Sequence, residues 1–293
     1  MAVNNMYDIL IIGAGPAGIS ASLYAKRANK DVLVLYHGAS QLEKAHKIDN
    51  YYGFPNGIDG SALYRNGIIQ AINLGVEVKE EEVLGIEMNS DRTYTVKTKG
   101  ETYSSKSVII ATGNKKLRPN IKGVKEFEGR GISYCAICDG FFYKDKNVAV
   151  LGNGEYALSE AKELENIANS VTVFTNGLDA PETDFKVITE KITEIKGETK
   201  VGSILLENGD EIPVDGVFIA LGVAGGGDFA KKLGVKVDGD RLVTDEKAAT
   251  NLPGVFACGD LTGGLLQVSK AVYDGAKAGL GAVEYIKNLD SKE

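Results

Sequence analysis

The chain has 293 residues, of which 43% are hydrophobic and 25% charged, and 36 are glycine. These values are typical of a soluble globular protein, and the length favours two domains. The net charge of −7, without a strongly basic domain, argues against nucleic-acid binding. The N-terminus lacks a basic segment, and glycine and proline interrupt the longest uncharged stretch, residues 9–25. We therefore expect a cytoplasmic protein without a signal peptide or a membrane span.

Apolar runs that end in glycine predict the buried parallel strands of the chain. The first run is residues 7–13, and it is followed by a predicted helix over about 17–28 and a strand at 32–36. Residues 93–98 alternate between polar and apolar side chains, which predicts an antiparallel strand. Residues 107–113 form another apolar run with a glycine stop, and they predict a further buried strand.

The same order of elements then repeats. A strand at 147–152 precedes a helix at 156–165 and a strand at 170–175, and an apolar strand ending in glycine follows at 216–222. This is an internal duplication of a strand–turn–helix–strand unit, and it indicates two dinucleotide-type domains. Another apolar strand, at 254–260, lies too late in the chain to belong to the second unit.

The simplest arrangement inserts the second domain into the first. The predicted fold class is α/β, with two Rossmann-like dinucleotide-binding domains. The first domain is expected to comprise residues 1–114 and 243–293, and the inserted domain residues 115–242.

The first glycine-rich fingerprint is Gly13-Ala14-Gly15-Pro16-Ala17-Gly18, between a strand and a helix. In this motif the first glycine makes the turn and the second lets the backbone approach a pyrophosphate. The third lets the helix pack closely against the strand. The sequence therefore predicts dinucleotide binding here, although the second strand ends at Tyr36-His37-Gly38 without the usual acidic residue for a ribose.

The second fingerprint is Gly152-Asn153-Gly154-Glu155-Tyr156-Ala157. The strand after it ends in Phe174-Thr175-Asn176-Gly177, with no acid for the ribose of NAD and no arginine for the phosphate of NADP. Two lost charge-assisted contacts of about 1.5–3 kcal/mol each weaken affinity by roughly 10²–10⁴. We also expect the ring of Tyr156 to crowd the pyrophosphate position. A vestigial nucleotide site is favoured over a functional one.

The third motif is Cys135-Ala136-Ile137-Cys138-Asp139-Gly140. A zinc site needs four ligands, and the remaining candidates, Cys258, His37 and His46, are not closely spaced. No metal site is therefore expected, and a redox-active dithiol of Cys135 and Cys138 is favoured. Cys258 lies within an apolar run and is interpreted as a buried structural thiol.

Together these motifs resemble the low-molecular-weight thioredoxin reductases. GAGPAG near the start, CxxCDG in the middle and VFACGD near the end occur in the family's order, and the resemblance covers nearly the whole chain. The cofactor implied is FAD. Besides Gly13, Gly15, Pro16, Ala17 and Gly18, the predicted FAD contacts are Gln41, Asn50, Thr112, Gly113, Gly259, Asp260 and Gln267. Among these, Gln41 and Asn50 match the family's flavin-facing loop, Gly259-Asp260 its ribityl-binding turn and Gln267 its flavin-edge contact.

The resemblance also implies a homodimer with one FAD in each subunit and the dithiol on the inserted domain. Cys138 is then the thiol that faces the flavin, and Cys135 is the thiol that attacks the disulfide of thioredoxin. Asp139 is the nearby acid or base.

The sequence departs from the family at residues 174–180, where the usual basic motif HRRxxxR is absent, and the segment up to Gly216 is short. In this respect it is similar to the flavin thioredoxin reductases that lack the NADPH site and take electrons from ferredoxin. A local basic cluster, Lys115, Lys116, Arg118, Lys122 and Lys125, either receives an acidic ferredoxin or is a solvated interdomain linker. Two alternatives stay open: an NADPH- or NADH-dependent thioredoxin reductase with an atypical site, and a redox sensor without turnover.

Overall fold

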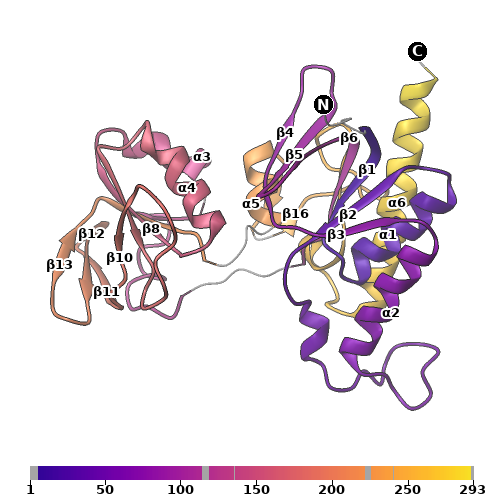
Figure 1. Cartoon of the computed structure of the whole chain (residues 1–293), viewed down its shortest axis with the longest axis horizontal. Helices are drawn as coiled ribbons and strands as arrows, with labels where there is room; N and C mark the ends of the chain where they lie inside the picture. Colours follow the sequence, from indigo (N-terminus) through magenta and orange to yellow (C-terminus); the bar gives the residue numbers. More distant parts are fainter. Residues whose placement is uncertain (1–5, 114–118, 135, 222–225, 240, 292–293) are drawn as a thin grey trace. The chain divides into compact units, whose positions relative to one another are not determined.

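The computed structural model divides the chain into two compact units (Figure 1). Unit 1 comprises Met1–Lys115 and Gly225–Glu293, and unit 2 is the continuous segment Lys116–Ala224 between them. Unit 2 is therefore inserted into unit 1. The structure describes residues 6–113, 119–134, 136–221, 226–239 and 241–291, without the side chains of 137, 138 and 226–228.

Unit 1 is a sheet-and-helix domain built from both ends of the chain. Its N-terminal elements are β1 (Met6–Ile12), α1 (Pro16–Arg27), β2 (Val32–Tyr36), η1 (Gln41–Lys44), α2 (Gly60–Asn73), β3 (Glu77–Glu80), β4 (Val83–Met88), β5 (Tyr94–Thr98) and β6 (Thr102–Ile110). Its C-terminal elements are α5 (Gly226–Leu233), β15 (Val237–Asp238), β16 (Arg241–Leu242), β17 (Val255–Ala257), η3 (Gly259–Thr262) and α6 (Val268–Asp290).

The main sheet of unit 1 has the strand order β3-β2-β1-β6-β5-β4, and β17 pairs with β6 beyond the end of β5. Strands β3, β2, β1, β6 and β17 are parallel, whereas β4 and β5 form an antiparallel extension. Ile12 of β1 pairs with Ile110 of β6, and Ile110 pairs with Ala257 of β17. Three parallel strands therefore end at the same level, which is where an open α/β sheet binds its ligand.

Helices α1 and α6 pack closely against one another beside this sheet (Figure 1). A Cβ added to Gly275 would lie 2.0 Å from the carbonyl oxygen of Ala17, and one added to Gly279 would lie 2.5 Å from that of Ala21. Glycine is required at both positions because the backbones of the two helices approach so closely. The contact joins the first and last helices of the chain.

Unit 2 contains a second parallel sheet. Its elements are β7 (Ile132–Ser133), α3 (Ala136–Asp139), η2 (Gly140–Tyr143), β8 (Asn147–Leu151), α4 (Glu155–Glu165), β9 (Ser170–Phe174), β10 (Lys186–Ile188), β11 (Ile192–Gly197), β12 (Val201–Leu206), β13 (Glu211–Pro213) and β14 (Gly216–Ile219). The parallel sheet has the order β10-β9-β8-β14-β7, and β11, β12 and β13 form a separate antiparallel sheet. The unit β8-α4-β9 with β14 repeats β1-α1-β2 with β6, so the predicted duplication and the α/β fold class are confirmed.

The chain returns to unit 1 earlier than the residue 243 expected from the sequence. Helix α5 contacts β4 and β16 of unit 1 and buries Phe229 and Ala230 there. Helix α5 and the described residues between it and Leu242 therefore pack with unit 1, although the sequence analysis assigned them to the inserted domain.

Helix α6 is the longest helix of the chain, and it carries charged residues along its length. Among the described residues, no helix has both the length and the apolar character needed to cross a bilayer.

Candidate functional site

The turn between β1 and α1 has the geometry of a pyrophosphate-binding turn. Gly13 has φ +112°, and a Cβ there would lie 2.4 Å from the carbonyl oxygen of Ala111. A Cβ on Gly18 would lie 1.8 Å from the carbonyl oxygen of Gly13. Gly15, the N-cap of α1, has no atom within 4 Å of where its Cβ would be. Two glycines are thus required by packing, and the third leaves open the approach to the helix N-terminus.

The N-terminal end of α1 is also electrostatically suited to bind an anion. The helix starts at Pro16, and its first turn contains no acidic residue. The free backbone N–H groups and the positive end of the helix dipole favour a phosphate at this position.

The predicted FAD contacts of β6 and β17 lie at the ends of their strands, next to this turn. Thr112 and Gly113 follow the end of β6, and Gly113 has φ +71° with open space at its Cβ position. Gly259 has φ +78°, and a Cβ there would lie 2.9 Å from the Cβ of Ala17. Gly259 and Asp260 begin η3. The structure therefore brings the predicted contacts of three distant segments to one edge of the sheet.

Asn50 and Gln267 are joined directly, although 217 residues separate them. Asn50 donates a hydrogen bond of 2.9 Å from Nδ2 to Oε1 of Gln267, which is the N-cap of α6. Gln41 begins η1, and among the described residues it forms no hydrogen bond with the other predicted FAD contacts. The loop after η1 and the start of α6 thus meet on unit 1, and the flavin contacts of Asn50 and Gln267 stay predictions.

A largely buried ion pair between Lys270 and Asp274 lies next to η3, and the sequence analysis did not predict it. Lys270 donates from Nζ to the carbonyl oxygen of Gly259 at 2.9 Å and to Oγ1 of Thr262 at 3.1 Å. Its Nζ also lies 2.7 Å from Oδ2 of Asp274, one helical turn further along α6. The two charged side chains are only 19% and 11% exposed. Lys270 therefore fastens the η3 turn to α6. The only sequence signal was an i,i+4 Lys–Asp spacing, which is typical of exposed helix faces.

The CxxC segment belongs to unit 2. Cys135 lies outside the described residues, and Cys138 lies in α3 with a side chain that is not described. Asp139 accepts a hydrogen bond of 2.6 Å at Oδ2 from Oγ of Ser133. The pairing of Cys135 with Cys138 stays a prediction, and so does the acid–base role of Asp139.

The second fingerprint keeps the fold of a nucleotide-binding turn. A Cβ on Gly152 would lie 2.1 Å from the carbonyl oxygen of Ala220 and 2.8 Å from the Cβ of Ala157. Glu155 is in the first turn of α4, where its carboxylate opposes a second negative charge. The matching turn of α1 carries no acid. The two helix N-termini therefore share a backbone motif but differ in their preference for phosphate.

The side chains of Thr175 and Asn176, which follow β9, form hydrogen bonds to the backbone of unit 2. Thr175 is fully buried and donates from Oγ1 to the carbonyl oxygen of Leu178 at 2.6 Å. Asn176 accepts at Oδ1 from the backbone N–H of Ile192 at 2.8 Å. Neither side chain carries a charge for a ribose or a 2′-phosphate, in agreement with the predicted loss of the nucleotide contacts.

The sequence analysis expected the ring of Tyr156 to crowd the pyrophosphate position, and the structure does not place it there. Its ring is 2% exposed, and its hydroxyl donates to the carbonyl oxygen of Tyr134 at 3.4 Å. Burial inside unit 2, and not projection over the glycine turn, accounts for a large side chain at this position. The Tyr156 ring therefore gives no support for a blocked pyrophosphate site.

The predicted basic cluster is only partly described, because residues 115–118 lie outside the described segments. Lys122 forms an ion pair of 2.8 Å between its Nζ and Oε1 of Glu194. The hydrogen bond to Glu194 raises the pKa of Lys122. This lysine is thus partnered within unit 2, and its charge is offset locally.

Cys258 is fully buried between β17 and η3, and burial raises the pKa of its thiol to about 12. It is protonated and inaccessible at neutral pH, in agreement with a structural thiol.

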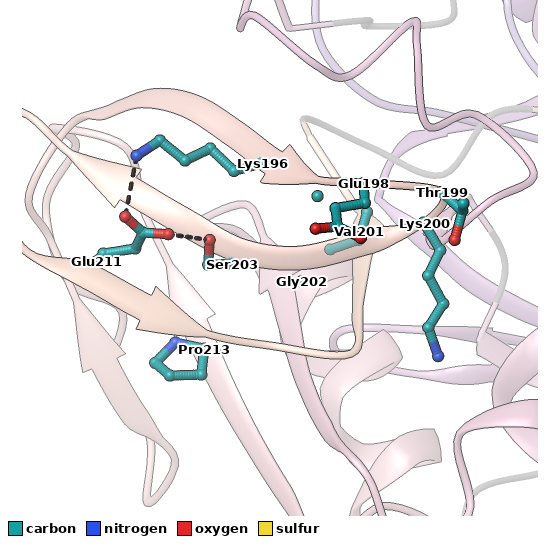
Figure 2. A pocket seen from close by; sticks show the side chains of 10 residues that line it. Lys196, Glu198, Thr199, Lys200, Val201, Gly202, Ser203, Glu211 and Pro213 are labelled. Carbon is teal, nitrogen blue, oxygen red and sulfur yellow. Dashed lines mark hydrogen bonds and ion pairs between the residues drawn. The ribbon is translucent and has the colours of Figure 1, made fainter.

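Figure 2 shows a shallow pocket over the antiparallel sheet of unit 2. Glu211 accepts a 2.5 Å hydrogen bond from Oγ of Ser203 and a 2.9 Å hydrogen bond from Nζ of Lys196. The hydrogen bond from Ser203, with that from Lys196, lowers the pKa of Glu211. Both oxygens of the carboxylate are thus occupied by the sheet itself. None of the predicted site residues lines this pocket.

Two glycine-turn βαβ units, one inserted into the other, define a two-domain dinucleotide-binding oxidoreductase fold. The chain belongs to the pyridine nucleotide-disulphide oxidoreductase family, whose model matches residues 7–275.

Individual relatives are similar along nearly their whole length. A thioredoxin reductase of Listeria innocua is 34% identical, covering 97% of this chain and 95% of the relative. A solved structure of an atypical thioredoxin reductase from Desulfovibrio vulgaris Hildenborough is 38% identical with a TM-score of 0.89, covering 97% of this chain and 99% of the other. A ferredoxin-flavin thioredoxin reductase from Clostridium acetobutylicum is 33% identical with a TM-score of 0.71 and the same coverage. The predicted resemblance to thioredoxin reductases is confirmed.

The cofactor of this family is FAD, and the prediction of an FAD-binding protein is confirmed at that level. The residues of unit 1 can accommodate FAD. No atom lies near the positions where Gly15 and Gly113 would carry a Cβ, and the first turn of α1 contains no acidic residue. The pyrophosphate would lie at the N-terminus of α1. Asn50, Gln267 and the Gly259–Asp260 turn would contact the remainder of the cofactor.

Proposed function

We propose that this protein reduces the disulfide of thioredoxin through Cys135 and Cys138 and takes its electrons from reduced ferredoxin. The observation that carries the choice of donor is the electrostatic difference between the two helix N-termini. The turn before α1 is open and free of acid, whereas α4 begins with Glu155 and is followed by a strand end without a charged ligand for a nucleotide.

The loss of nucleotide contacts can be expressed as affinity. NAD sites use an acid on the ribose, and NADP sites use an arginine on the 2′-phosphate. Thr175 and Asn176 occupy this region and are hydrogen-bonded to the chain. Two missing charge-assisted contacts weaken binding by roughly 10²–10⁴. The similarity to a ferredoxin-flavin thioredoxin reductase supports the same donor.

The thiol chemistry proposed here uses the CxxC pair, and the resemblance to thioredoxin reductases assigns the attack on thioredoxin to Cys135. The thiolate of Cys135 attacks one sulfur of the thioredoxin disulfide and forms a mixed disulfide, and the other thioredoxin sulfur leaves as a thiolate and takes up a proton. The thiolate of Cys138 then attacks Cys135, which releases reduced thioredoxin and leaves a Cys135–Cys138 disulfide. Two electrons from two reduced ferredoxins, with two protons, return this disulfide to the dithiol. Asp139 is proposed to exchange protons with the cysteines.

The energetics permit this donor. A ferredoxin near about −400 mV and thioredoxin near about −270 mV differ by roughly 130 mV, or about 6 kcal/mol for two electrons. When bound, FAD supplies the one- and two-electron chemistry that links a single-electron donor to a disulfide. A protein donor needs only close approach to the flavin, and no deep nucleotide pocket.

The deciding experiment is anaerobic titration of the purified protein with NADPH, NADH and reduced ferredoxin, followed through the flavin absorbance. We expect full flavin reduction by about four equivalents of reduced ferredoxin per subunit, two for the Cys135–Cys138 disulfide and two for FAD, and none by either nucleotide at the same concentrations. Saturable thioredoxin reduction with NADPH at a micromolar KM, and none with ferredoxin, would instead establish the nucleotide-dependent alternative. A sensor without turnover would be reduced once and would not reduce excess thioredoxin.

The predicted assembly is a homodimer, and size-exclusion chromatography with light scattering tests it. A mass of one chain at micromolar concentration would exclude a stable dimer.

A further inference from the structure

The turn η3, which carries the predicted FAD contacts Gly259 and Asp260, has little conformational restraint of its own. Gly259, Gly263 and Gly264 have φ values of +78°, +73° and +77°, in the left-handed region that glycine enters freely. The N-cap of η3 is Cys258, and its side chain forms no capping hydrogen bond. A glycine-rich turn samples many conformations unless other parts of the chain hold it. The geometry that a ligand meets here has to be fixed from outside the turn.

The side chain of Lys270 supplies this restraint from α6. An ammonium group has three N–H donors. In Lys270, one donates to the carbonyl oxygen of Gly259 at 2.9 Å and another to Oγ1 of Thr262 at 3.1 Å. The third is met by Oδ2 of Asp274, which lies 2.7 Å from the nitrogen. Both ends of η3 are thus tied to one nitrogen. Since its donors are all used within unit 1, Lys270 acts on the turn and not by direct contact with a ligand.

The peptide group between Gly259 and Asp260 is the part of η3 that is held most firmly. Besides the bond from Lys270, the carbonyl oxygen of Gly259 accepts a hydrogen bond of 2.9 Å from Oγ1 of Thr262. A peptide group is planar and trans, so this carbonyl and the N–H of Asp260 point in opposite directions. Holding the carbonyl toward Lys270 therefore turns the N–H of Asp260 away from it.

The N–H of Asp260 is available to a ligand. Asp260 is the second residue of η3, where a backbone N–H has no acceptor inside the helix. No other described group accepts a hydrogen bond from it. The orientation of this donor is thus set by the Lys270 contacts, and the donor lies at a predicted FAD contact.

Stability alone does not account for an ion pair at this place. Lys270 and Asp274 are only 19% and 11% exposed, so both charges have lost most of their water. A buried ion pair is often no more stabilising than apolar residues of similar volume. The pair between Lys247 and Glu284 of α6 is a useful contrast. Its side chains are 62% and 53% exposed, and among the described residues it is not hydrogen-bonded to η3.

We propose that Lys270 is a positioning residue for FAD. With Asp274 as its counterion, it holds η3 in the conformation that presents the N–H of Asp260 to the cofactor. The inference rests on the predicted FAD contacts at Gly259 and Asp260, and it is independent of the electron donor. A turn that is ordered before binding lowers the ordering cost that the cofactor must meet. The affinity for FAD therefore depends on the ammonium group itself, and not only on the stability of unit 1.

The test measures FAD affinity and stability in parallel on the full-length apoprotein. FAD affinity is measured by flavin fluorescence titration, and the melting temperature by circular dichroism. Lys270→Met removes the ammonium group but keeps an unbranched side chain. We expect its affinity for FAD to fall roughly 10- to 100-fold and its melting temperature to fall as well.

The double variant Lys270→Met/Asp274→Leu separates the two effects. It leaves no unpaired charge in the interior, so its melting temperature should return toward that of wild type. Its η3 turn is still untied, so its affinity for FAD should stay as weak as that of Lys270→Met. A residue that only stabilised the fold would give a double variant with both properties restored.

Two further variants test the contacts one at a time. Thr262→Val removes the hydroxyl that joins Lys270 to the carbonyl of Gly259, and we expect FAD binding to weaken about three- to tenfold. Lys247→Met is the matched control, because it breaks an ion pair with α6 that is exposed. Its affinity for FAD should stay within about twofold of wild type.

The proposal is wrong if the double variant recovers its FAD affinity together with its melting temperature, or if Lys270→Met binds FAD as tightly as wild type. If Lys270→Met does not fold, the double variant and Thr262→Val decide the question. The assay needs neither an electron donor nor thioredoxin. A failure of the proposed function would therefore leave this result unchanged, and a failure here would leave the choice of donor open to its own titration.

Discussion

The side chain of Asn50 donates a 2.9 Å hydrogen bond to the side chain of Gln267, which connects the loop after η1 to the N-cap of α6. Both residues are predicted flavin contacts, so each fixes the position of the other before a cofactor binds. Preorganisation of this kind reduces the ordering cost of binding.

Gln267→Leu is expected to weaken FAD binding by about tenfold, because it removes a hydrogen bond of about 1–1.5 kcal/mol and leaves Asn50 less constrained. The measurement is titration of the apoprotein with FAD by flavin fluorescence. Asn208→Ala is the control, since Asn208 lies in unit 2 and hydrogen-bonds to Asp210. An affinity within twofold of wild type for Gln267→Leu would contradict the assignment.

The variants Gly15→Val and Gly18→Val should separate an effect on FAD binding from an effect on folding. The position of a Cβ on Gly15 is open, so this variant should fold and lose FAD, whereas a Cβ on Gly18 meets the carbonyl oxygen of Gly13 at 1.8 Å. We expect Gly18→Val to lower the melting temperature of the apoprotein by several degrees and Gly15→Val to leave it nearly unchanged. Retention of FAD by Gly15→Val would exclude this turn as the pyrophosphate site.

The Lys270–Asp274 pair gives a stability prediction. Lys270→Met leaves the carboxylate of Asp274 nearly buried without its cation, and we expect a loss of about 3 kcal/mol in the free energy of unfolding. The double variant Lys270→Met/Asp274→Leu should recover much of this loss, since no charge is then buried. Urea unfolding of the apoproteins measures both. Equal stability of wild type and Lys270→Met would show that the pair is effectively solvated.

Cys258 should be inert in the native protein. Burial raises its thiol pKa from 9.0 to about 12, so a thiol reagent at pH 8 should modify at most two cysteines of the reduced protein and the third only after unfolding. In the unfolded chain the thiol ionises above about pH 9, whereas the folded chain keeps it protonated. The free energy of unfolding should therefore fall as the pH rises from about 9 to about 12. Cys258→Ala should reduce this slope.

Cys138→Ser should trap a covalent complex. If Cys135 attacks thioredoxin, the mixed disulfide cannot be resolved in this variant and should accumulate with oxidised thioredoxin. Non-reducing electrophoresis detects it, with the Cys135→Ser/Cys138→Ser double variant as the control. FAD content should be the same in both. A complex formed by Cys135→Ser and not by Cys138→Ser would reverse the assigned roles of the two cysteines.

The strands were predictable wherever a short apolar run ends in glycine, as in β1, β8 and β14. Their buried faces and sharp turns impose that pattern on the sequence. Strand β11 carries charged residues between its apolar ones because it is partly exposed, and β13 has only three residues, so no apolar run marks either strand. The residue at which the chain returns to unit 1 was predicted too late in the sequence. Helix α5 is short, and nothing in its own sequence shows which sheet it packs on.

The site was predictable from its motifs but not from spacing alone. Gly13, Gly15 and Gly18 follow from the mechanism of the turn, whereas Asn50 and Gln267 were assigned through resemblance. No local pattern reveals a hydrogen bond across 217 residues. The direction of Tyr156 could have been inferred from its 3.6-residue periodicity with Glu160 and Leu164, which places all three on the buried face of α4.

The packing of α6 on α1 has a consequence for biosynthesis. Unit 2 is a continuous segment and is fully synthesised before β17, η3 and α6 leave the ribosome. Domains generally fold as units while the chain is being made. The inserted domain can therefore fold while unit 1 still lacks a strand and its longest helix. Gly259 and Gln267 follow unit 2 in the chain, so a nascent chain that ends before β17 has a complete inserted domain but still lacks these two predicted FAD contacts.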